Sequence, residues 1–279
     1  MVQQSGRRPT VRDVAAAAGV SRGTVSRFLN GGLWVSPAAR EAVERAIAET
    51  GYRVNPLARS LATGRANSVA FLLTEPHELL FEDPNFATLL IGCTQALAEQ
   101  GVALVLLVAG TDPERERAIE FVTGAHVDGV ILVSPHRDNF LLERLAGSQL
   151  PIVVSGSPRD FNADVSFVGA DGVRGGRTVT QILVERGCRR VGMITGPMDT
   201  SGGPERLRGF QEALGDRFDP ALVVHGDWSP ASGRAGMAEL LARAPDLDGL
   251  FGGNDAMAAG AIAVLQEAGR SVPDDVAVV

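Results

Sequence analysis

The sequence contains no lysine and only two cysteines. The small number of cysteines limits the kind of fold that the chain can have. Its two cysteines, Cys93 and Cys188, lie far apart among 279 residues. Two such cysteines cannot make a disulfide framework, so small buried thiols in a reducing cytoplasm are expected. No apolar run reaches the roughly 18 residues that a membrane helix needs, and Met1–Thr10 is polar without a signal cleavage site. Neither a membrane span nor a secretory signal is therefore expected.

Sequence signatures of catalysis are missing as well. There is no G-x-G-x-x-G after an expected strand, no phosphate-binding G-x-x-x-x-G-K-[ST] loop and no G-x-S-x-G elbow. The carboxylates show no catalytic pairing. The histidines lack the spacing of metal ligands and are expected on the surface or at strand ends; they are His77, His126, His136 and His225. The sequence therefore predicts a protein that is no enzyme and that holds neither a metal nor another cofactor.

The length suggests two or three compact units, and 45% hydrophobic with 21% charged residues is typical of a soluble globular protein.

Charge is divided unevenly along the chain. Residues 1–65 carry ten arginines against four acidic residues, whereas the rest carries 16 arginines against 29 acidic residues. A basic segment on an acidic body predicts that only the N-terminal part meets a polyanion.

Residues 10–51 show the spacing of three short helices. Apolar residues recur at helical intervals after Thr10 and again after Ser21, and Gly19 separates the two runs. A third helix is expected between Ser36 and Gly51. Two short helices joined by a tight glycine-containing turn make a helix-turn-helix, whose second helix enters the major groove of DNA.

The identities of these residues indicate a particular protein family more specifically than their spacing does. TVRDVAAAAGVSRGTVSRFLN at residues 10–30 closely resembles the head of the LacI family of bacterial transcription regulators, and GYRVNPLARSLATGR at residues 51–65 resembles its hinge. The resemblance implies a helix-turn-helix domain over residues 1–54, a hinge helix and linker over 55–66, and an effector-binding domain over 67–279. It also implies a set of DNA contacts: Thr10, Ser21, Arg22, Gly23, Thr24, Ser26, Arg27, Asn30, Tyr52, Asn55, Arg59 and Leu61.

Some of these contacts have alternatives. Gly23 has no side chain, so one base-reading position is expected to be blank. The hydroxyls of Thr24 and Ser26 fit a contact with DNA backbone alone about as well as a base contact. The segment Pro56–Ala62 is too short to be a stable free helix. The resemblance makes Leu61 a wedge that inserts into the minor groove, while the alternative is that it packs the head onto the body.

From Ser68 onward, apolar strands alternate with helices, which is typical of parallel α/β sheets. The resemblance implies the periplasmic-binding-protein-like sensor fold, with two doubly wound halves over about 67–163 and 164–279 and a ligand cleft between them. Because the family continues past Val279, the second half is expected to be incomplete at its C-terminal end, as in a fragment or a truncated gene. The expected strands are Val69–Leu73, Val102–Val108, Gly129–Val133 and Ile152–Val154, then Val165–Gly169, Arg190–Thr195, Leu222–His225, Gly249–Phe251 and Val276–Val279.

The resemblance further implies four effector contacts: Phe86, Arg206, Trp228 and Asn254. A guanidinium offers a planar fork of donors to ligand oxygens, and a flat aromatic ring covers a sugar or a base. Asp255 is expected to cap the helix that follows Asn254. The alternatives are core packing for Phe86 and Trp228, and an interdomain salt bridge for Arg206. The chemistry fits a sugar or a nucleoside equally, and the family favours a sugar or related metabolite.

The sequence thus predicts an all-α head joined to an α/β sensor, in a cytoplasmic, sequence-specific transcriptional regulator. A homodimer is expected on palindromic operator DNA, acting as a repressor in the commoner case and controlled by a small-molecule effector. A sugar-transport protein would share the body but requires a signal peptide and no basic head. A sugar-converting enzyme requires a catalytic constellation, which the sequence lacks.

Overall fold

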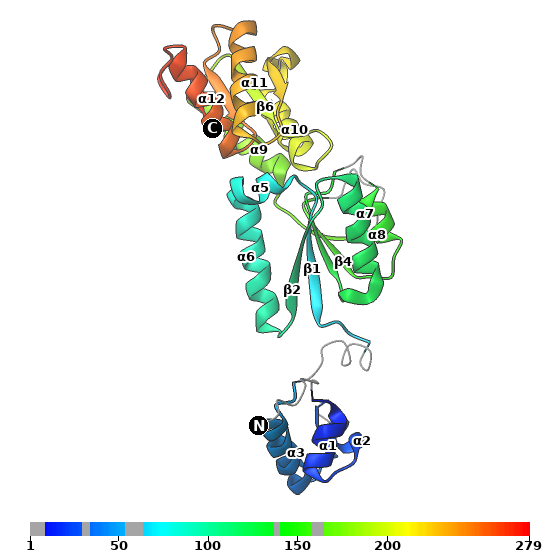
Figure 1. The fold of residues 1–279 in the computed structure, drawn as a ribbon. Helices are drawn as coiled ribbons and strands as arrows, with labels where there is room; N and C mark the ends of the chain where they lie inside the picture. The colour runs from blue at the N-terminus through cyan, green and yellow to red at the C-terminus, as the bar shows by residue number, and fades with distance from the viewer. Residues whose placement is uncertain (1–8, 30–33, 54–63, 137–139, 158–164) are drawn as a thin grey trace. The chain divides into compact units, whose positions relative to one another are not determined.

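The computed structural model describes residues 9–29, 34–53, 64–136, 140–157 and 165–279. It divides into two compact units, Met1–Ala66 and Asn67–Val279, and each is described by itself (Figure 1). No helix within the described ranges is long and apolar enough to cross a lipid bilayer.

The first unit is a three-helix head. Its helices are α1 (Val11–Ala18), α2 (Arg22–Leu29) and α3 (Pro37–Thr50). Thr10 and Asp13 form a capping box at the start of α1. Gly19 ends the helix in the left-handed region, which glycine adopts without a steric penalty. One face of each helix is buried in a common core, made of Val14, Ala15, Val25, Val43 and Ala46. The helical spacing of the sequence therefore predicted this head correctly.

The second unit begins with a five-stranded parallel sheet in the order β2-β1-β3-β4-β5. Side chains alternate across it, so that Leu72 faces α7 and α8 while Phe71 packs on the side of α5 and α6. Helices thus cover both faces (Figure 1), as the doubly wound prediction requires. The elements are β1 (Ser68–Leu73), α5 (His77–Glu82), α6 (Pro84–Glu99), β2 (Ala103–Val108), α7 (Asp112–Phe121), η1 (Val122–His126), β3 (Val130–Val133), α8 (Leu141–Ala146), β4 (Ile152–Ser155) and β5 (Ser166–Val168).

The short strand β5 corrects one expectation. The sequence pattern placed Val165–Gly169 at the start of the second series, with the boundary between the halves at 163/164. That boundary is wrong for this strand, because β5 pairs in parallel with β4, with Val154 opposite Phe167. Pairing with β5 satisfies backbone groups that β4 would otherwise leave open at the edge of the sheet. A three-residue apolar pattern carries no information about which sheet it joins.

The second half holds a four-stranded parallel sheet in the order β7-β6-β8-β9. Helices α9 and α10 pack on one side against Met193, and α11 and α12 pack on the other against Ile194. Two doubly wound halves are therefore confirmed. The elements are α9 (Gly172–Glu185), β6 (Val191–Thr195), α10 (Gly202–Leu214), η2 (Gly215–Arg217), η3 (Pro220–Leu222), β7 (Val223–His225), α11 (Pro230–Arg243), β8 (Gly249–Gly252), α12 (Asp255–Glu267) and β9 (Ala277–Val278).

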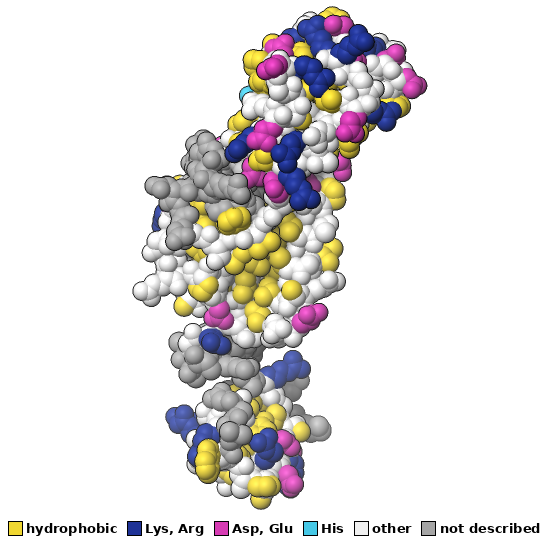
Figure 2. All heavy atoms as spheres, turned by 180° about the vertical axis from the view of Figure 1, so that it is seen from behind, with side chains coloured by type: hydrophobic (Ala, Val, Ile, Leu, Met, Phe, Trp, Pro, Cys, Tyr) yellow, Lys and Arg dark blue, Asp and Glu magenta, His cyan; other side chains and the backbone are white. Residues whose placement is uncertain are grey.

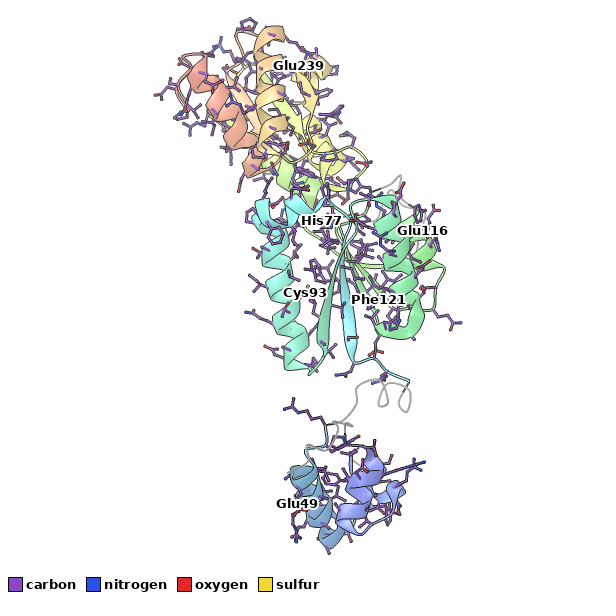
Figure 3. The ribbon with its side chains drawn as sticks, viewed as in Figure 1. Glu49, His77, Cys93, Glu116, Phe121 and Glu239 are labelled. Carbon is purple, nitrogen blue, oxygen red and sulfur yellow. The ribbon has the colours of Figure 1, made fainter. Side chains whose placement is uncertain are left out.

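Part of the apolar surface of the first half is open to solvent. Leu106 and Val153 lie in register with the face that carries Phe71, yet they are 40% and 39% exposed. Figure 2 shows hydrophobic side chains gathered on the first half in the view from behind. The two cysteines are free thiols. Cys188 is buried as predicted, whereas Cys93 on α6 (Figure 3) is only half-buried.

Candidate functional site

The outer face of α2 is exposed and polar. Arg22, Gly23, Ser26 and Arg27 are exposed, while Val25 on the opposite face is fully buried. Together with Val11 from α1, the first three of these residues line a shallow hollow of about 400 Å³. Arg27 is held along the helix, since its Nε donates to the carbonyl oxygen of Gly23 at 3.2 Å. The structure thus brings the predicted base-reading residues onto one accessible surface.

The hydroxyls at the start of α2 also have a structural role. Ser21 Oγ accepts a hydrogen bond from the backbone nitrogen of Thr24 at 3.1 Å and lies 2.9 Å from Thr24 Oγ1. Thr10 likewise donates from its backbone nitrogen and its hydroxyl to Asp13 Oδ2, at 2.7 and 2.8 Å. Tyr52 packs against the core of the head. The observed role of Thr10, Ser21 and Thr24 is helix capping, and that of Tyr52 is packing. Their contacts with DNA stay predictions.

The head carries many exposed arginines. Every arginine in its described part is exposed: Arg12, Arg22, Arg27, Arg40, Arg45, Arg53 and Arg65. Guanidinium groups on a protein surface can contact phosphate oxygens, which dominate the affinity of proteins for DNA. Four further predicted contacts lie outside the described residues: Asn30, Asn55, Arg59 and Leu61.

A second cluster of predicted residues lies at the strand ends of the second half. Arg206, near the start of α10, places its Cζ 5.1 Å from the centre of the Trp228 ring. Trp228 follows β7 with a φ of 71°, an unusual conformation for a bulky residue. Its indole lies directly over Gly196, where a Cβ atom would sit 2.0 Å from two ring atoms. The absence of a side chain at Gly196 thus makes room for the ring.

The guanidinium of Arg206 is shielded from water and faces acidic charge. Burial lowers the pKa of Arg206, while the charges of Glu205 and Asp83 act in the opposite direction. Asp83 belongs to the first half, where its Oδ1 caps α6 by accepting from the nitrogen of Asn85 at 2.8 Å. No ion pair joins Arg206 to another residue within the described ranges. Its donors are therefore suited to ligand oxygens, and the charge of Asp83 acts on Arg206 across the two halves without forming an ion pair.

The side chain of Asn254 has a structural role. Its Oδ1 accepts from the backbone nitrogen of Met257 at 2.8 Å, so Asn254 is the N-cap of α12, and the expectation that Asp255 caps this helix is wrong. Its Nδ2 donates to the carbonyl oxygen of Trp228 at 2.9 Å. The side chain thus fixes the backbone that carries the indole, and a direct effector contact by Asn254 stays a prediction.

Phe86, in the first half, is a core residue. It is 5% exposed and packs with Phe71, Leu73 and Leu80 in the core of the first half. This is the core-packing alternative of the sequence analysis. The sequence analysis missed Asp83 and Gly196, although the Asp83-Pro84 helix start and the glycine directly after β6 were visible signals. Over the described part of the chain, no three His, Cys, Asp or Glu residues are grouped so that they could hold a metal ion.

Comparison with known proteins identifies the family of both units. Residues 10–55 match the model for bacterial regulatory proteins of the lacI family, and residues 66–279 match the model for periplasmic binding proteins and the sugar binding domain of the LacI family. The chain belongs to the LacI family. It is accordingly a DNA-binding transcriptional regulator, in which an α/β sensor domain follows the helix-turn-helix head in the sequence.

Individual relatives within the LacI family cover nearly all of the chain. The HTH-type transcriptional regulator CelR of Thermobifida fusca is 47% identical over 277 residues, which is 98% of this chain and 82% of that protein. A structure of a CelR–cellobiose complex is 45% identical, covers 97% and 82% of the two chains, and has a TM-score of 0.74. A crystal structure of the lac repressor dimer bound to operator and the anti-inducer ONPF is 26% identical, covers 98% and 82%, and has a TM-score of 0.83.

Proposed function

We propose that this chain is a cytoplasmic repressor that binds a palindromic operator as a homodimer, acts without catalysis and is controlled by a sugar effector. The exposed arginine-bearing face of α2 supports operator binding. The lac repressor, to which the chain is similar, is a dimer on its operator. A dimer presents two copies of α2 and so matches a DNA site with twofold symmetry.

The effector proposal depends on the stack of Arg206 on Trp228. The indole offers a flat apolar face for the C–H face of a sugar ring, and the guanidinium offers donors for its hydroxyl oxygens. Asp83 supplies an acceptor charge from the other half of the sensor. Since the CelR in the similar structure binds cellobiose, we propose a sugar of that class as the effector, with a nucleoside as the alternative.

Intrinsic fluorescence provides the test, because the chain has two tryptophans, one in each unit. Trp34 is 88% exposed in the head, so Trp34→Phe leaves Trp228 as the sole reporter without disturbing a packed core. Cellobiose, ribose and guanosine are titrated into this variant, and operator release is followed by gel shift. We expect cellobiose to change the Trp228 emission and to release the operator. A response to guanosine alone would replace the sugar with a nucleoside, and no response to any of them would count against the site.

Arg22→Ala should weaken operator binding by about 1–3 kcal/mol, or about five- to 150-fold, because it removes an exposed guanidinium from the predicted base-reading face of α2. The operator is first selected from a random DNA library with the full chain, and affinity is then measured by fluorescence anisotropy. Arg45→Ala removes the same charge from an exposed position on α3 and is the matched control. A phosphate contact predicts an equal loss on all sequences, so Arg22→Ala must also relax specificity at one base pair. Equal, sequence-independent losses in both variants would contradict base reading by Arg22.

A further inference from the structure

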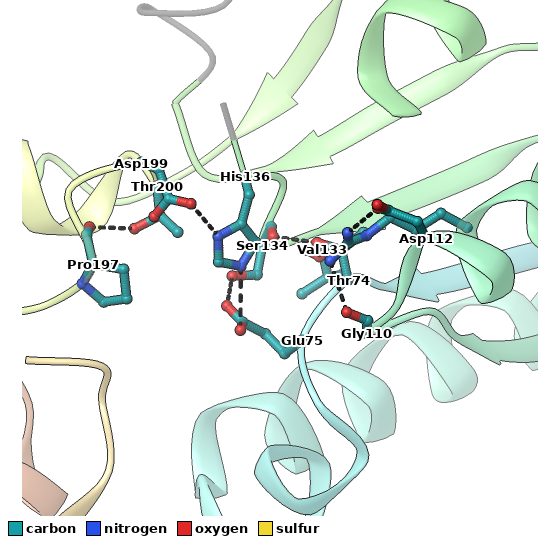
Figure 4. A network of polar contacts seen from close by, with 11 residues as sticks. Thr74, Glu75, Gly110, Asp112, Val133, Ser134, His136, Pro197, Asp199 and Thr200 are labelled. Atoms are coloured by element: carbon teal, nitrogen blue, oxygen red, sulfur yellow. Dashed lines mark hydrogen bonds and ion pairs between the residues drawn. The ribbon is translucent and has the colours of Figure 1, made fainter. Parts of the chain in front are cut away.

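Three charged side chains meet where the two α/β halves of the sensor touch. Glu75 lies two residues after the end of β1 and His136 three residues after the end of β3, both in the first half. Asp199 lies in the loop between β6 and α10, in the second half. Figure 4 shows His136 between the two carboxylates. None of the three belongs to the predicted DNA or effector contacts.

The distances show that both nitrogens of the imidazole are engaged. His136 Nε2 lies 3.2 Å from Glu75 Oε2, and His136 Nδ1 lies 2.8 Å from Asp199 Oδ2. Ser134 Oγ donates to the remaining Glu75 oxygen, Oε1. A neutral imidazole has one donor and one acceptor nitrogen, whereas an imidazolium has two donors. Two carboxylate partners therefore require the charged, doubly protonated ring.

The surroundings explain why the charge is retained. The hydrogen bond to Glu75 raises the pKa of His136 to about 9, despite its burial, and the charges of Glu75 and Asp199 act in the same direction. A second ion pair in this network joins Arg115 to Asp112 at 2.7 Å. Arg115 also donates a hydrogen bond to the carbonyl oxygen of Gly110, which Figure 4 labels beside Asp112. That cation is already paired with its own acid, and within the described part of the sensor the positive partner of Glu75 is His136.

The network depends on the histidine charge because Glu75 is only 3% exposed. A carboxylate this deeply buried needs a cationic or hydrogen-bonding partner, and without the imidazolium Ser134 alone would remain to it among the described residues. On the other side, Thr200 Oγ1 donates to the carbonyl oxygen of Pro197 and closes the loop that carries Asp199. This loop leads into α10 at Gly202, four residues before Arg206.

We propose that Glu75, His136 and Asp199 form a clasp that holds the two halves of the sensor together while the histidine is charged. The clasp makes Glu75 and His136 positioning residues for the 196–201 loop and for the start of α10. Loss of the proton from His136 leaves one nitrogen as an acceptor facing a carboxylate, and the contact between the halves then opens.

The direction of the pH dependence follows from the raised pKa. The joined state binds the proton more tightly than the separated state, in which the histidine returns to its ordinary value near 6.5. The clasp therefore contributes fully below about pH 6.5 and is lost as the pH rises through about 9. Between pH 6.5 and 9.5 we expect the joined-to-separated ratio to fall about ten- to hundredfold, since one pKa unit corresponds to a factor of ten.

The distance between the halves is the quantity to measure. Spin labels are placed at exposed Glu120 on α7 and Gln266 on α12, in the full chain with Cys93→Ser and Cys188→Ala. Labelled chain is diluted with unlabelled chain, so that only pairs within one subunit contribute to the double electron–electron resonance signal. Thermal melting and circular dichroism first establish that each protein is folded.

The expected result is one short distance at pH 6.5 and a second, longer distance at pH 9.5. His136→Gln should show the longer distance at both pH values. His77→Gln is the matched control, because His77 pairs with Glu114 at 3.5 Å inside the first half, and it should behave as the parent (Figure 3). Asp199→Asn, on a partly exposed loop residue, repeats the test if His136→Gln fails to fold. Identical distances in the parent and the folded variants at both pH values, or an unchanged pH response in His136→Gln, would overturn the clasp.

Discussion

Gly196→Ala is expected to weaken effector binding about 30- to 150-fold while operator binding without effector is kept. The new Cβ would lie 2.0 Å from two atoms of the Trp228 ring, so the indole must leave its place. Gly196 is buried directly after β6, which leaves the backbone little room to retreat. Displacing the ring removes the aromatic face and the stacking of Arg206 together, about 2–3 kcal/mol in sum. A tenfold change corresponds to 1.4 kcal/mol.

The measurement is a titration of cellobiose by calorimetry, alongside a gel shift with the selected operator. Gly175→Ala is the matched control, because a Cβ there meets no atom within 4 Å on α9 of the same half. The control should bind effector as the parent does and melt at the same or a higher temperature, since alanine favours a helix by about 1 kcal/mol over glycine. Normal effector affinity in Gly196→Ala would show that the placement of Trp228 does not matter for binding.

Val25→Asp should abolish operator binding and unfold the head, while the sensor keeps its stability and its effector affinity. Val25 is 0% exposed at the centre of a core that α1, α2 and α3 share. A buried carboxylate without a partner costs several kcal/mol, and a three-helix unit of this size has little stability to spare. The sensor is a separate compact unit with its own cores, so the damage is confined to the head.

Circular dichroism and a melting curve report the loss of helix, and Trp228 fluorescence in the Trp34→Phe background reports the sensor. Ala17→Asp adds the same charge at an exposed position of α1 and is the control for electrostatic repulsion of DNA. It should keep the head folded and lower operator affinity far less. If Val25→Asp also lowered the melting temperature of the sensor, the two units would not be energetically independent.

Helix starts and ends in the head could be predicted because their causes are local. Thr10 and Asp13 lie three residues apart, and Gly19 directly follows the last residue of α1. Such caps act through hydrogen bonds within one helical turn, so a short window of sequence contains the whole interaction. The positions of the buried strands were predicted for a similar reason, since a run of apolar residues between turns is itself the signal.

Residues far apart in sequence could not be paired in the same way. The pattern at Val165–Gly169 showed a strand but not its neighbour, and β5 joined the first sheet instead of the second. The letters Asn254-Asp255 showed a cap but not which residue makes it, because the choice depends on the backbone conformation at Asn254. Phe86 matched a ligand-lining position by resemblance, yet its helix turns the ring into the core.

The sequence by itself determined the membership in the LacI family, the helix-turn-helix head and the alternation of strands and helices in the sensor. These are properties of caps, periodicities and contiguous motifs, which short stretches of chain contain in full. The tertiary structure alone decided that Trp228 lies on Gly196 and that His136 meets Asp199, 63 residues away. Contacts of this kind depend on strand order and on the crossovers between the two halves, and no local pattern of residues specifies either.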